Sequence, residues 1–313
     1  KRHVHLLWRS VAAFLDLLKS GRIRDDQLGQ RFRILIHTGS GIEEQILTLR
    51  ADREHPLHYA PQRDGPGRLL AKEVGLDTLH ARAQQLVRDA NHEVEWDRCE
   101  PSRLGSGLLM GTATAGQMEV LRASNGTWLT IDAPRLEPDA LDLTTVRLPA
   151  AAAPIAATFL ISPLARHLAE VLREAMEAGG GPVALVGPET VARGCLQAGR
   201  LIEGGLPHYF DRLEPVAIAV MCGQEPEFEH LIDYDAVVPA NREYVSEEMS
   251  GFEWGRGKTD SEFYILKGET EVRHWEISAA QGPTRNVPVA LRIRQTPGQS
   301  WARLTVSSAE WEP

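Results

Sequence analysis

The hydrophobic periodicity of the chain changes near Pro207, and this change constrains the fold more than any other feature of the sequence. Upstream, residues 157–202 alternate short apolar runs with segments of helical spacing, which is typical of strands joined by helices. Downstream, apolar residues recur at every second position, as in residues 216–220. A period of two is the spacing of a strand with one buried face. The sequence therefore predicts an α+β protein whose α/β part comes first and whose last part is nearly all β.

The length of the chain favours two domains, because single hydrophobic cores stop growing at about 250 residues and this chain has 313. Its hydrophobic fraction of 42% and charged fraction of 25% predict a folded protein. We expect one domain over residues 1–206 and another over residues 207–313. The chain begins at Lys1 and residues 4–18 already show helical spacing, so we expect a further segment upstream.

Charge and cysteine usage exclude several classes of protein. A formal net charge of −9 argues against nucleic-acid binding, which depends on Lys and Arg that neutralise phosphates. No apolar run reaches the roughly 20 residues that span a bilayer, and no secretion signal is recognisable, so we expect a cytoplasmic protein without a membrane partner. Cys99, Cys195 and Cys222 are far apart and form no C-x-x-C pair, which argues against structural zinc and disulfides.

Residues 1–154 carry several local patterns. Residues 4–18 predict a helix that Gly21 ends in a left-handed conformation. Asp77 is a candidate N-cap inside a helical stretch, residues 69–88. The remaining expectations are a strand pair at 32–36 and 45–49, an exposed loop at 52–67, a β-meander at 108–110, 118–121 and 127–131, and a connector at 134–154.

Residues 157–306 predict a series of strands and helices. In the α/β part we expect strands at 157–161 and 183–186 and helices at 163–176 and 189–202, with Pro163 in a first helical turn. In the β part we expect strands at 216–220, 263–266, 272–277, 289–293 and 302–306.

Four short motifs follow one another between Thr158 and Ser307. They are the strand Thr158-Phe159-Leu160-Ile161 with the helix from Pro163 to Leu172, the run Pro188-Glu189-Thr190-Val191-Ala192-Arg193-Gly194-Cys195, the segment His230-Leu231-Ile232 through Val238-Pro239, and Phe263-Tyr264-Ile265-Leu266-Lys267-Gly268-Glu269. Their shared order resembles the end of the nucleotide-binding domain of Hsp70-type chaperones, followed by the start of the substrate-binding β-sandwich. The resemblance implies a partial actin-like α/β lobe over residues 1–206 and a small antiparallel β-sandwich over residues 207–313.

This resemblance implies ATP or ADP with Mg²⁺ as a ligand of the intact protein, and a polypeptide client or partner protein. In the family, the glycine-rich sequence Gly-Gly-x-[Ser/Thr]-Arg lets the backbone lie against adenosine, whereas here Ser162-Pro163 takes its place. The family's opening phosphate loop, Asp-x-Gly-Thr-Thr, does not occur in this chain. We therefore expect nucleotide binding by this chain to be weakened or absent.

A strand that runs into Thr38-Gly39-Ser40-Gly41 is the candidate for a second phosphate loop. Successive backbone N–H groups in such small-residue turns can form an anion-binding concavity. The resemblance places an acidic, Mg²⁺-holding residue at the end of this strand, where the chain has His37. The alternative is a tight hairpin turn that needs glycine for its dihedral angles. Ser162 completes the set of candidate cofactor-binding residues.

The segment Trp254-Gly255-Arg256-Gly257-Lys258 is the candidate partner-binding patch in the β-rich part. An exposed indole beside the cations of Arg256 and Lys258 could contact a partner, and the alternative is an ordinary loop between strands. The pairs His3/His5 and His55/His58 lack a neighbouring carboxylate or thiolate at metal-site spacing, so surface histidines are favoured over a metal site. The thiols of Cys195 and Cys222 are expected to be buried.

Three functions remain open on these grounds. The first is an Hsp70-like molecular chaperone or a fragment of one. The second is a scaffold or protein-interaction module that kept the chaperone fold and lost nucleotide chemistry. The third is an unrelated α/β enzyme, for which no nucleophile and base can be assembled from these residues, so that no catalytic residue is predicted.

Overall fold

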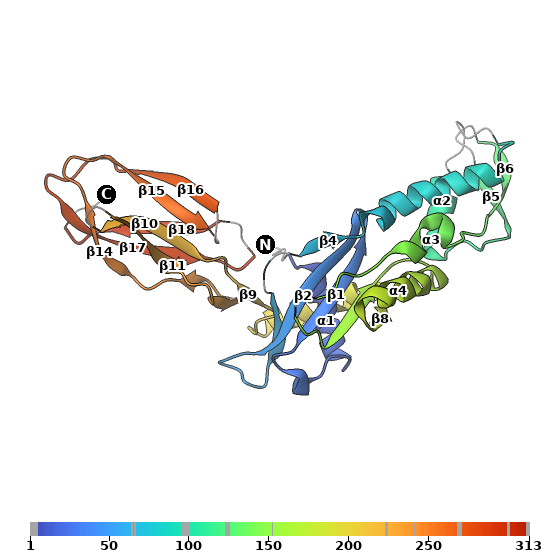
Figure 1. Ribbon diagram of the computed structural model, residues 1–313, viewed down its shortest axis with the longest axis horizontal. Coiled ribbons are helices and arrows are strands. Elements are labelled where there is room, and N and C mark those ends of the chain that lie inside the picture. The colour runs from blue at the N-terminus through green and yellow to red at the C-terminus, as the bar shows by residue number, and fades with distance from the viewer. Residues whose placement is uncertain are drawn as a thin grey trace. The chain divides into compact units, whose positions relative to one another are not determined.

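In the computed structural model the chain forms two compact units (Figure 1). Unit 1 comprises residues 1–49 and 66–199, and unit 2 comprises residues 50–65 and 200–313. The described residues are 6–63, 65, 67–94, 101–122, 126–151, 153–222, 225–240, 242–267, 271–298 and 301–310. A mixed sheet, several antiparallel sheets and five α-helices occur among them, which confirms the α+β class. The predicted boundary between a domain over residues 1–206 and one over residues 207–313 stays a prediction.

Unit 1 is built on a mixed sheet. Its strands β1, β7 and β8 run parallel in this order, β2 returns antiparallel to β1, and β4 is antiparallel to β2. Helix α4 (Arg166–Gly180) joins β7 to β8, and α5 (Glu189–Glu203) follows β8, which confirms the predicted order of strands and helices. Helix α4 begins three residues after Pro163, so the prediction of Pro163 in a first helical turn is wrong. The strands are β1 (Arg31–Thr38), β2 (Gly41–Ala51), β4 (Arg68–Leu70), β7 (Ala157–Ile161) and β8 (Val183–Val186).

Strand β1 is buried on both faces because helices cover both. Phe32 packs edge-on against Phe14 of helix α1 (Arg9–Lys19), with ring centroids 5.4 Å apart. On the opposite face Leu35 belongs to a core that includes Leu168 and Leu172 of α4. Alternating faces of one strand therefore belong to different packing layers, as the period of two requires.

Helix α1 begins at Arg9, later than the predicted start at Val4, and residues 6–8 precede it without helical structure. Gly21 has φ of +75°, which confirms the left-handed residue expected after the helix. Helix α5 lies against α1 so closely that a Cβ on Gly194 would overlap the carbonyl oxygen of Ala12. Beside this contact, Arg193 forms an ion pair with Asp16 at 2.8 Å.

Residues 68–110 differ from the expectation. The stretch 69–88 is not one helical region, because it contains β4, a 3-10 turn (Lys72–Val74) and the first part of α2 (Leu76–Ala90). Residues 108–110 end a helix, α3 (Ser102–Met110), and do not form a strand. Gly105 allows α3 to approach α2, since a Cβ there would lie 3.2 Å from the backbone nitrogen of Gln84.

The other two predicted strands of the meander form an antiparallel hairpin, β5 (Met118–Arg122) and β6 (Trp128–Asp132), as expected from the Asn-Gly turn signal. The predicted connector at 134–154 contains two 3-10 turns, Asp139–Leu141 and Leu143–Thr145. Leu141 and Leu143 are fully buried in the core of unit 1, so this connector is part of the packed structure.

Unit 2 contains a strand in the segment predicted to be a loop. Strand β3 (Tyr59–Arg63) runs parallel to β9 (Phe210–Arg212), which pairs antiparallel with β12 (Val237–Pro239). Arg63 pairs with Asp211 at 3.1 Å, and both side chains are buried. The prediction of an exposed loop over 52–67 is therefore wrong at 59–63, where long-range pairing overrides the local composition.

The rest of unit 2 consists of two antiparallel sheets. One has the order β11-β10-β15-β16, and in the other β17 pairs with β13 and β14 and with β18. Ile218 and Leu231 from the first sheet share a core with Leu291 and Ile293 from the second. The bounds are β10 (Val216–Cys222), β11 (Glu225–Ile232), β13 (Tyr244–Val245), β14 (Met249–Trp254), β15 (Asp260–Lys267), β16 (Glu271–Ser278), β17 (Val287–Gln295) and β18 (Arg303–Ser307).

Every second residue of β17 is buried from Val287 to Ile293, as the periodicity in this part of the sequence predicts. Within the described residues, no helix has the length and apolar character needed to cross a membrane.

Candidate functional site

The candidate functional site lies at the carboxyl edge of the parallel strands of unit 1. Ile36 of β1 is opposite Ile161 of β7, so the residues that follow them, His37 and Ser162, lie side by side at this edge. In open α/β sheets ligands bind beyond the carboxyl ends of parallel strands. Three of the features predicted from the sequence meet at this edge: the glycine turn after β1, Ser162, and the loop that leads into α4.

The turn after β1 is a two-residue hairpin turn in which Thr38 pairs with Gly41. The hydroxyl of Thr38 donates a hydrogen bond to the carbonyl oxygen of Gly41 at 3.0 Å. The carbonyl oxygen of Gly39 accepts one from the backbone N–H of Asp77 at 3.1 Å, in the first turn of α2. This geometry confirms the hairpin turn, while binding of phosphate by Thr38, Gly39, Ser40 and Gly41 stays a prediction.

Asp77 changes the electrostatics of this turn. A Cβ on Gly39 would lie only 2.7 Å from Oδ2 of Asp77, so the carboxylate packs directly against the glycine. Asp77 is the second residue of α2 and not its N-cap, which is Gly75, so the predicted capping role is wrong. A carboxylate at this position repels a phosphate group. The sequence pattern predicts only that Asp77 lies at a helix end, and no spacing in the sequence indicates its contact with the turn.

His37 and Ser162 form a hydrogen-bonded chain beneath the turn. Nε2 of His37 lies 2.7 Å from the carbonyl oxygen of Val74, which can only accept, so Nε2 carries the proton. Nδ1 therefore accepts, and the Ser162 hydroxyl donates to it at 3.0 Å. Ser162 Oγ also accepts from the backbone N–H of Leu164 at 3.3 Å. Ser162 is 3% exposed, so its hydroxyl connects β1 to β7 and does not face an open site.

The buried position of His37 predicts a pH-dependent loss of stability. Burial lowers the pKa of His37 to about 4, although the hydrogen bond to Val74 opposes the shift. Between this value and the unfolded-state pKa of about 6.5, the unfolded chain binds more protons, so stability falls as pH falls. We expect His37 to reduce the free energy of unfolding by about 2 kcal/mol between pH 7 and pH 5.

The measurement is urea unfolding at pH 7, 6 and 5 for the wild type and for His37→Gln, whose amide can donate to Val74 and accept from Ser162. The difference between the two free energies of unfolding at each pH isolates the contribution of His37, because the carboxyl groups contribute equally to both proteins. An identical slope with pH in both proteins would show that His37 does not titrate in the folded state as described.

A hollow of about 460 Å³ opens where the loop after β7 enters α4. The backbone N–H of Ala165 donates to the carbonyl oxygen of Leu109 at 2.6 Å and so joins this loop to α3. Met110 and Arg166 both line the hollow and are exposed. The lining residues are Leu108, Met110, Gly111, Ala113, Thr114, Ala115, Leu136, Leu164, Ala165, Arg166 and His167. The loop follows the strand at which the resemblance to Hsp70-type chaperones predicts an adenosine-binding loop. No pattern in the sequence indicates the contribution of α3 to the hollow.

The patch predicted around Trp254 is not exposed as a whole. Trp254 is 3% exposed, packs in the core of unit 2, and its Nε1–H donates to the carbonyl oxygen of Lys258 at 2.9 Å. The backbone N–H of Arg256 donates to Oδ1 of Asn286 at 2.9 Å. The prediction of an exposed indole is therefore wrong, because the turn folds over the ring, while Arg256 and Lys258 remain exposed.

The histidine and cysteine candidates have ordinary structural surroundings. The prediction that His55 lacks a neighbouring carboxylate is wrong, because its Nδ1 lies 2.7 Å from Oδ2 of Asp52, three residues earlier. Nε2–H of His58 donates to the carbonyl oxygen of Pro207 at 2.6 Å. No group of three or more potential metal ligands occurs in the part of the chain that the structure describes. Cys195 is exposed, so its predicted burial is wrong, because Gly194 takes the packing position on α5. His3, His5 and Cys99, and the side chain of Cys222, lie outside the described residues.

No protein-family model matches the chain, and no curated protein sequence matches it.

Proposed function

We propose that this chain is an Hsp70-like protein, or part of one, in which a divergent actin-like lobe with weakened nucleotide binding precedes a β-sandwich that binds polypeptide. The hollow at the first turn of α4 carries the proposal, because it lies where the resemblance locates adenosine. The fold gives further support. The parallel order β1-β7-β8 with an antiparallel β2 suits an actin-like lobe, and the shared core of the two antiparallel sheets in unit 2 suits a sandwich.

The same edge contains features that weaken nucleotide binding. The carboxylate of Asp77 packs against Gly39, and the hydroxyl of Ser162 is engaged by His37 and Leu164. These observations favour a second candidate, a scaffold or interaction module that kept the fold and lost nucleotide chemistry. In either case the partner is a polypeptide, and the exposed cations of Arg256 and Lys258 favour an acidic one.

Calorimetry with ADP and Mg²⁺ on the intact chain separates the two candidates. We expect a dissociation constant of about 0.1–1 mM, which corresponds to roughly 4–5.5 kcal/mol of binding free energy. Arg166→Gln should weaken binding at least about fivefold, since it removes a cation from the lining of the hollow.

The matched control is Arg31→Gln, an exposed arginine at the opposite end of β1, which should leave the affinity unchanged. Absence of binding at about 10 mM ADP, or equal effects of the two variants, would contradict the nucleotide-binding proposal and support the scaffold.

A further inference from the structure

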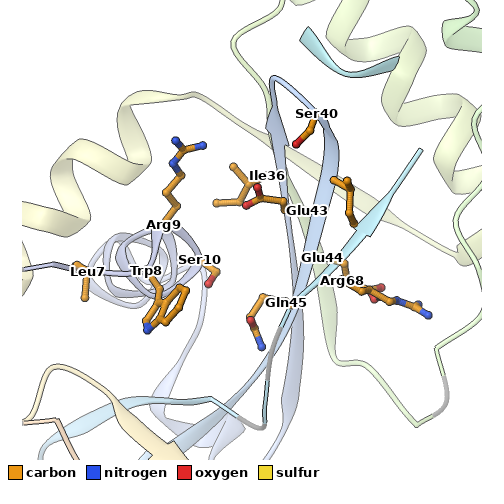
Figure 2. A pocket seen from close by; sticks show the side chains of 12 residues that line it. Leu7, Trp8, Arg9, Ser10, Ile36, Ser40, Glu43, Glu44, Gln45 and Arg68 are labelled. Carbon is orange, nitrogen blue, oxygen red and sulfur yellow. The ribbon is translucent and has the colours of Figure 1, made fainter. Parts of the chain in front are cut away.

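A second hollow, of about 520 Å³, lies between the start of α1 and strands β1, β2 and β4, and its size is that of a small-molecule site (Figure 2). Leu7, Trp8, Ile36 and Leu69 give it an apolar lining. Trp8 is about half exposed there. An apolar lining with a few convergent polar groups is the usual composition of a ligand site.

The start of α1 makes one end of this hollow electropositive. The first intrahelical hydrogen bond runs from the N–H of Ala12 to the carbonyl oxygen of Trp8 at 3.0 Å, so the preceding N–H groups have no partner within the helix. The first turn contains no acidic residue, and Trp8 makes no side-chain cap. Arg9 adds a guanidinium that forms no ion pair with any described residue. An anionic group is favoured at such a helix end.

Ser10 is an independent indication that the hollow takes a ligand. Its side chain lines the hollow although the residue is only 9% exposed. Within the described part of the chain its hydroxyl has no hydrogen-bond partner. The hydroxyl is not among the side-chain atoms that are sealed from solvent without a partner, so it faces the hollow and is available to hydrogen-bond a molecule there. A ligand oxygen next to the first turn of α1 would supply the missing partner.

A carboxylate faces this helix end from the sheet. Glu43 of β2 is in register with Ile36 of β1 and Leu69 of β4, so the three side chains share the face that α1 covers. Figure 2 shows the carboxylate of Glu43 extending from β2 toward α1, whereas the guanidinium of Arg68 points away from α1. Glu43 is exposed and forms no ion pair among the described residues.

We propose that this hollow binds a zwitterionic ligand that joins a carboxylate, an ammonium and an apolar side chain, as in a free apolar α-amino acid or a short peptide. The ligand carboxylate accepts hydrogen bonds from the first turn of α1, the Ser10 hydroxyl and Arg9. The ammonium pairs with Glu43, and the apolar side chain packs on Trp8 and Leu69. This site requires neither nucleotide nor client binding and so goes beyond the proposed function.

Calorimetry on the intact chain with three matched ligands tests the chemistry. L-Phenylalanine should bind with a dissociation constant of about 1 mM. 3-Phenylpropionate lacks the ammonium and 2-phenylethylamine lacks the carboxylate, and each should bind at least about fivefold more weakly. Phenylalanylglycine distinguishes a free amino acid from a short peptide as the ligand. Tighter binding of this dipeptide than of phenylalanine identifies a peptide site, and weaker binding identifies an amino-acid site.

Variants assign the two ends of the ligand. Ser10→Ala and Arg9→Gln should each weaken the binding of phenylalanine and of phenylpropionate by about three- to tenfold. The same variants should leave the affinity for phenylethylamine unchanged. Glu43→Gln should weaken the binding of phenylalanine and of phenylethylamine and leave the affinity for phenylpropionate unchanged. The control Arg22→Gln, beyond the other end of α1, should change none of them.

Ser10→Ala should unfold at the same temperature as the wild type, because the hydroxyl has no partner to lose. The proposal is overturned if neither phenylalanine nor the dipeptide binds at about 10 mM. It is equally overturned if phenylethylamine or phenylpropionate binds as tightly as phenylalanine, or if the three pocket variants bind phenylalanine like the wild type.

Discussion

Gly194→Ala should destabilise unit 1 by about 3 kcal/mol or more, because the added methyl group has no space. A Cβ at this position of α5 would overlap the carbonyl oxygen of Ala12 and lie 2.9 Å from its Cα. These are backbone atoms of α1, so no side-chain rotation can relieve the overlap, and one helix must move. That movement also disturbs the ion pair between Arg193 and Asp16. The measurement is the free energy of unfolding from urea titration, followed by circular dichroism.

Gly199→Ala is the matched control, because Gly199 lies on the same helix and a Cβ there meets nothing within 4 Å. This variant should be stabilised by about 0.5–1 kcal/mol, since alanine has the higher helix propensity. Equal stability of the two variants would show that α5 does not lie against α1 as the structure has it.

Glu44→Gln should lower the free energy of unfolding by about 3–5 kcal/mol, because it leaves a buried guanidinium without its carboxylate. Arg33 is 1% exposed and Glu44 4% exposed, and the two form an ion pair inside unit 1. Arg33 also donates to the carbonyl oxygen of Pro149 at 2.9 Å, which does not replace the lost charge. Arg68, the other partner of Glu44, is half exposed and can turn to water.

Glu189→Gln provides the comparison. It removes an exposed carboxylate that pairs with Arg193 at 3.3 Å, and should change the stability by less than about 0.5 kcal/mol. If urea titration gave both glutamine variants the same stability, the pair formed by Arg33 and Glu44 would be solvated and not part of the core.

The regular elements could be predicted where the sequence pattern is local. The strand–helix–strand–helix order of residues 157–203 follows from apolar spacing alone. The turn at Gly39 and the hairpin β5–β6 follow from short-range glycine signals. In each of these cases the residues that determine the structure lie within a few positions of one another.

The prediction was wrong where distant residues decide the structure. Residues 59–63 contain Pro61 and lie among His, Pro and Arg, yet they form a strand because β9, almost 150 residues later, pairs with them. Residues 108–110 are apolar enough for a strand, but they end a helix that Gly105 fits against α2. Trp254 was predicted to be exposed because two glycines and two cations follow it, although the turn to Lys258 buries the ring.

The candidate site was predictable only in part for the same reason. The turn from Thr38 to Gly41 was identified from a local pattern and Ser162 from the resemblance to Hsp70-type chaperones. The hydrogen bond between His37 and Ser162 joins the ends of their two strands. The contact of Asp77 with Gly39, the contribution of Met110 and the partnerless hydroxyl of Ser10 depend on which elements meet in space. No spacing in the sequence shows such contacts.

The discontinuity of unit 2 determines how the protein can be dissected. A gene fragment that starts at residue 200 encodes both antiparallel sheets but omits residues 50–65, and with them strand β3. Asp211 would then be left in the interior without Arg63. A truncation that respects the architecture has to graft residues 50–65 onto the later segment through an engineered linker, so simple domain boundaries chosen from the linear sequence would yield an incomplete fragment.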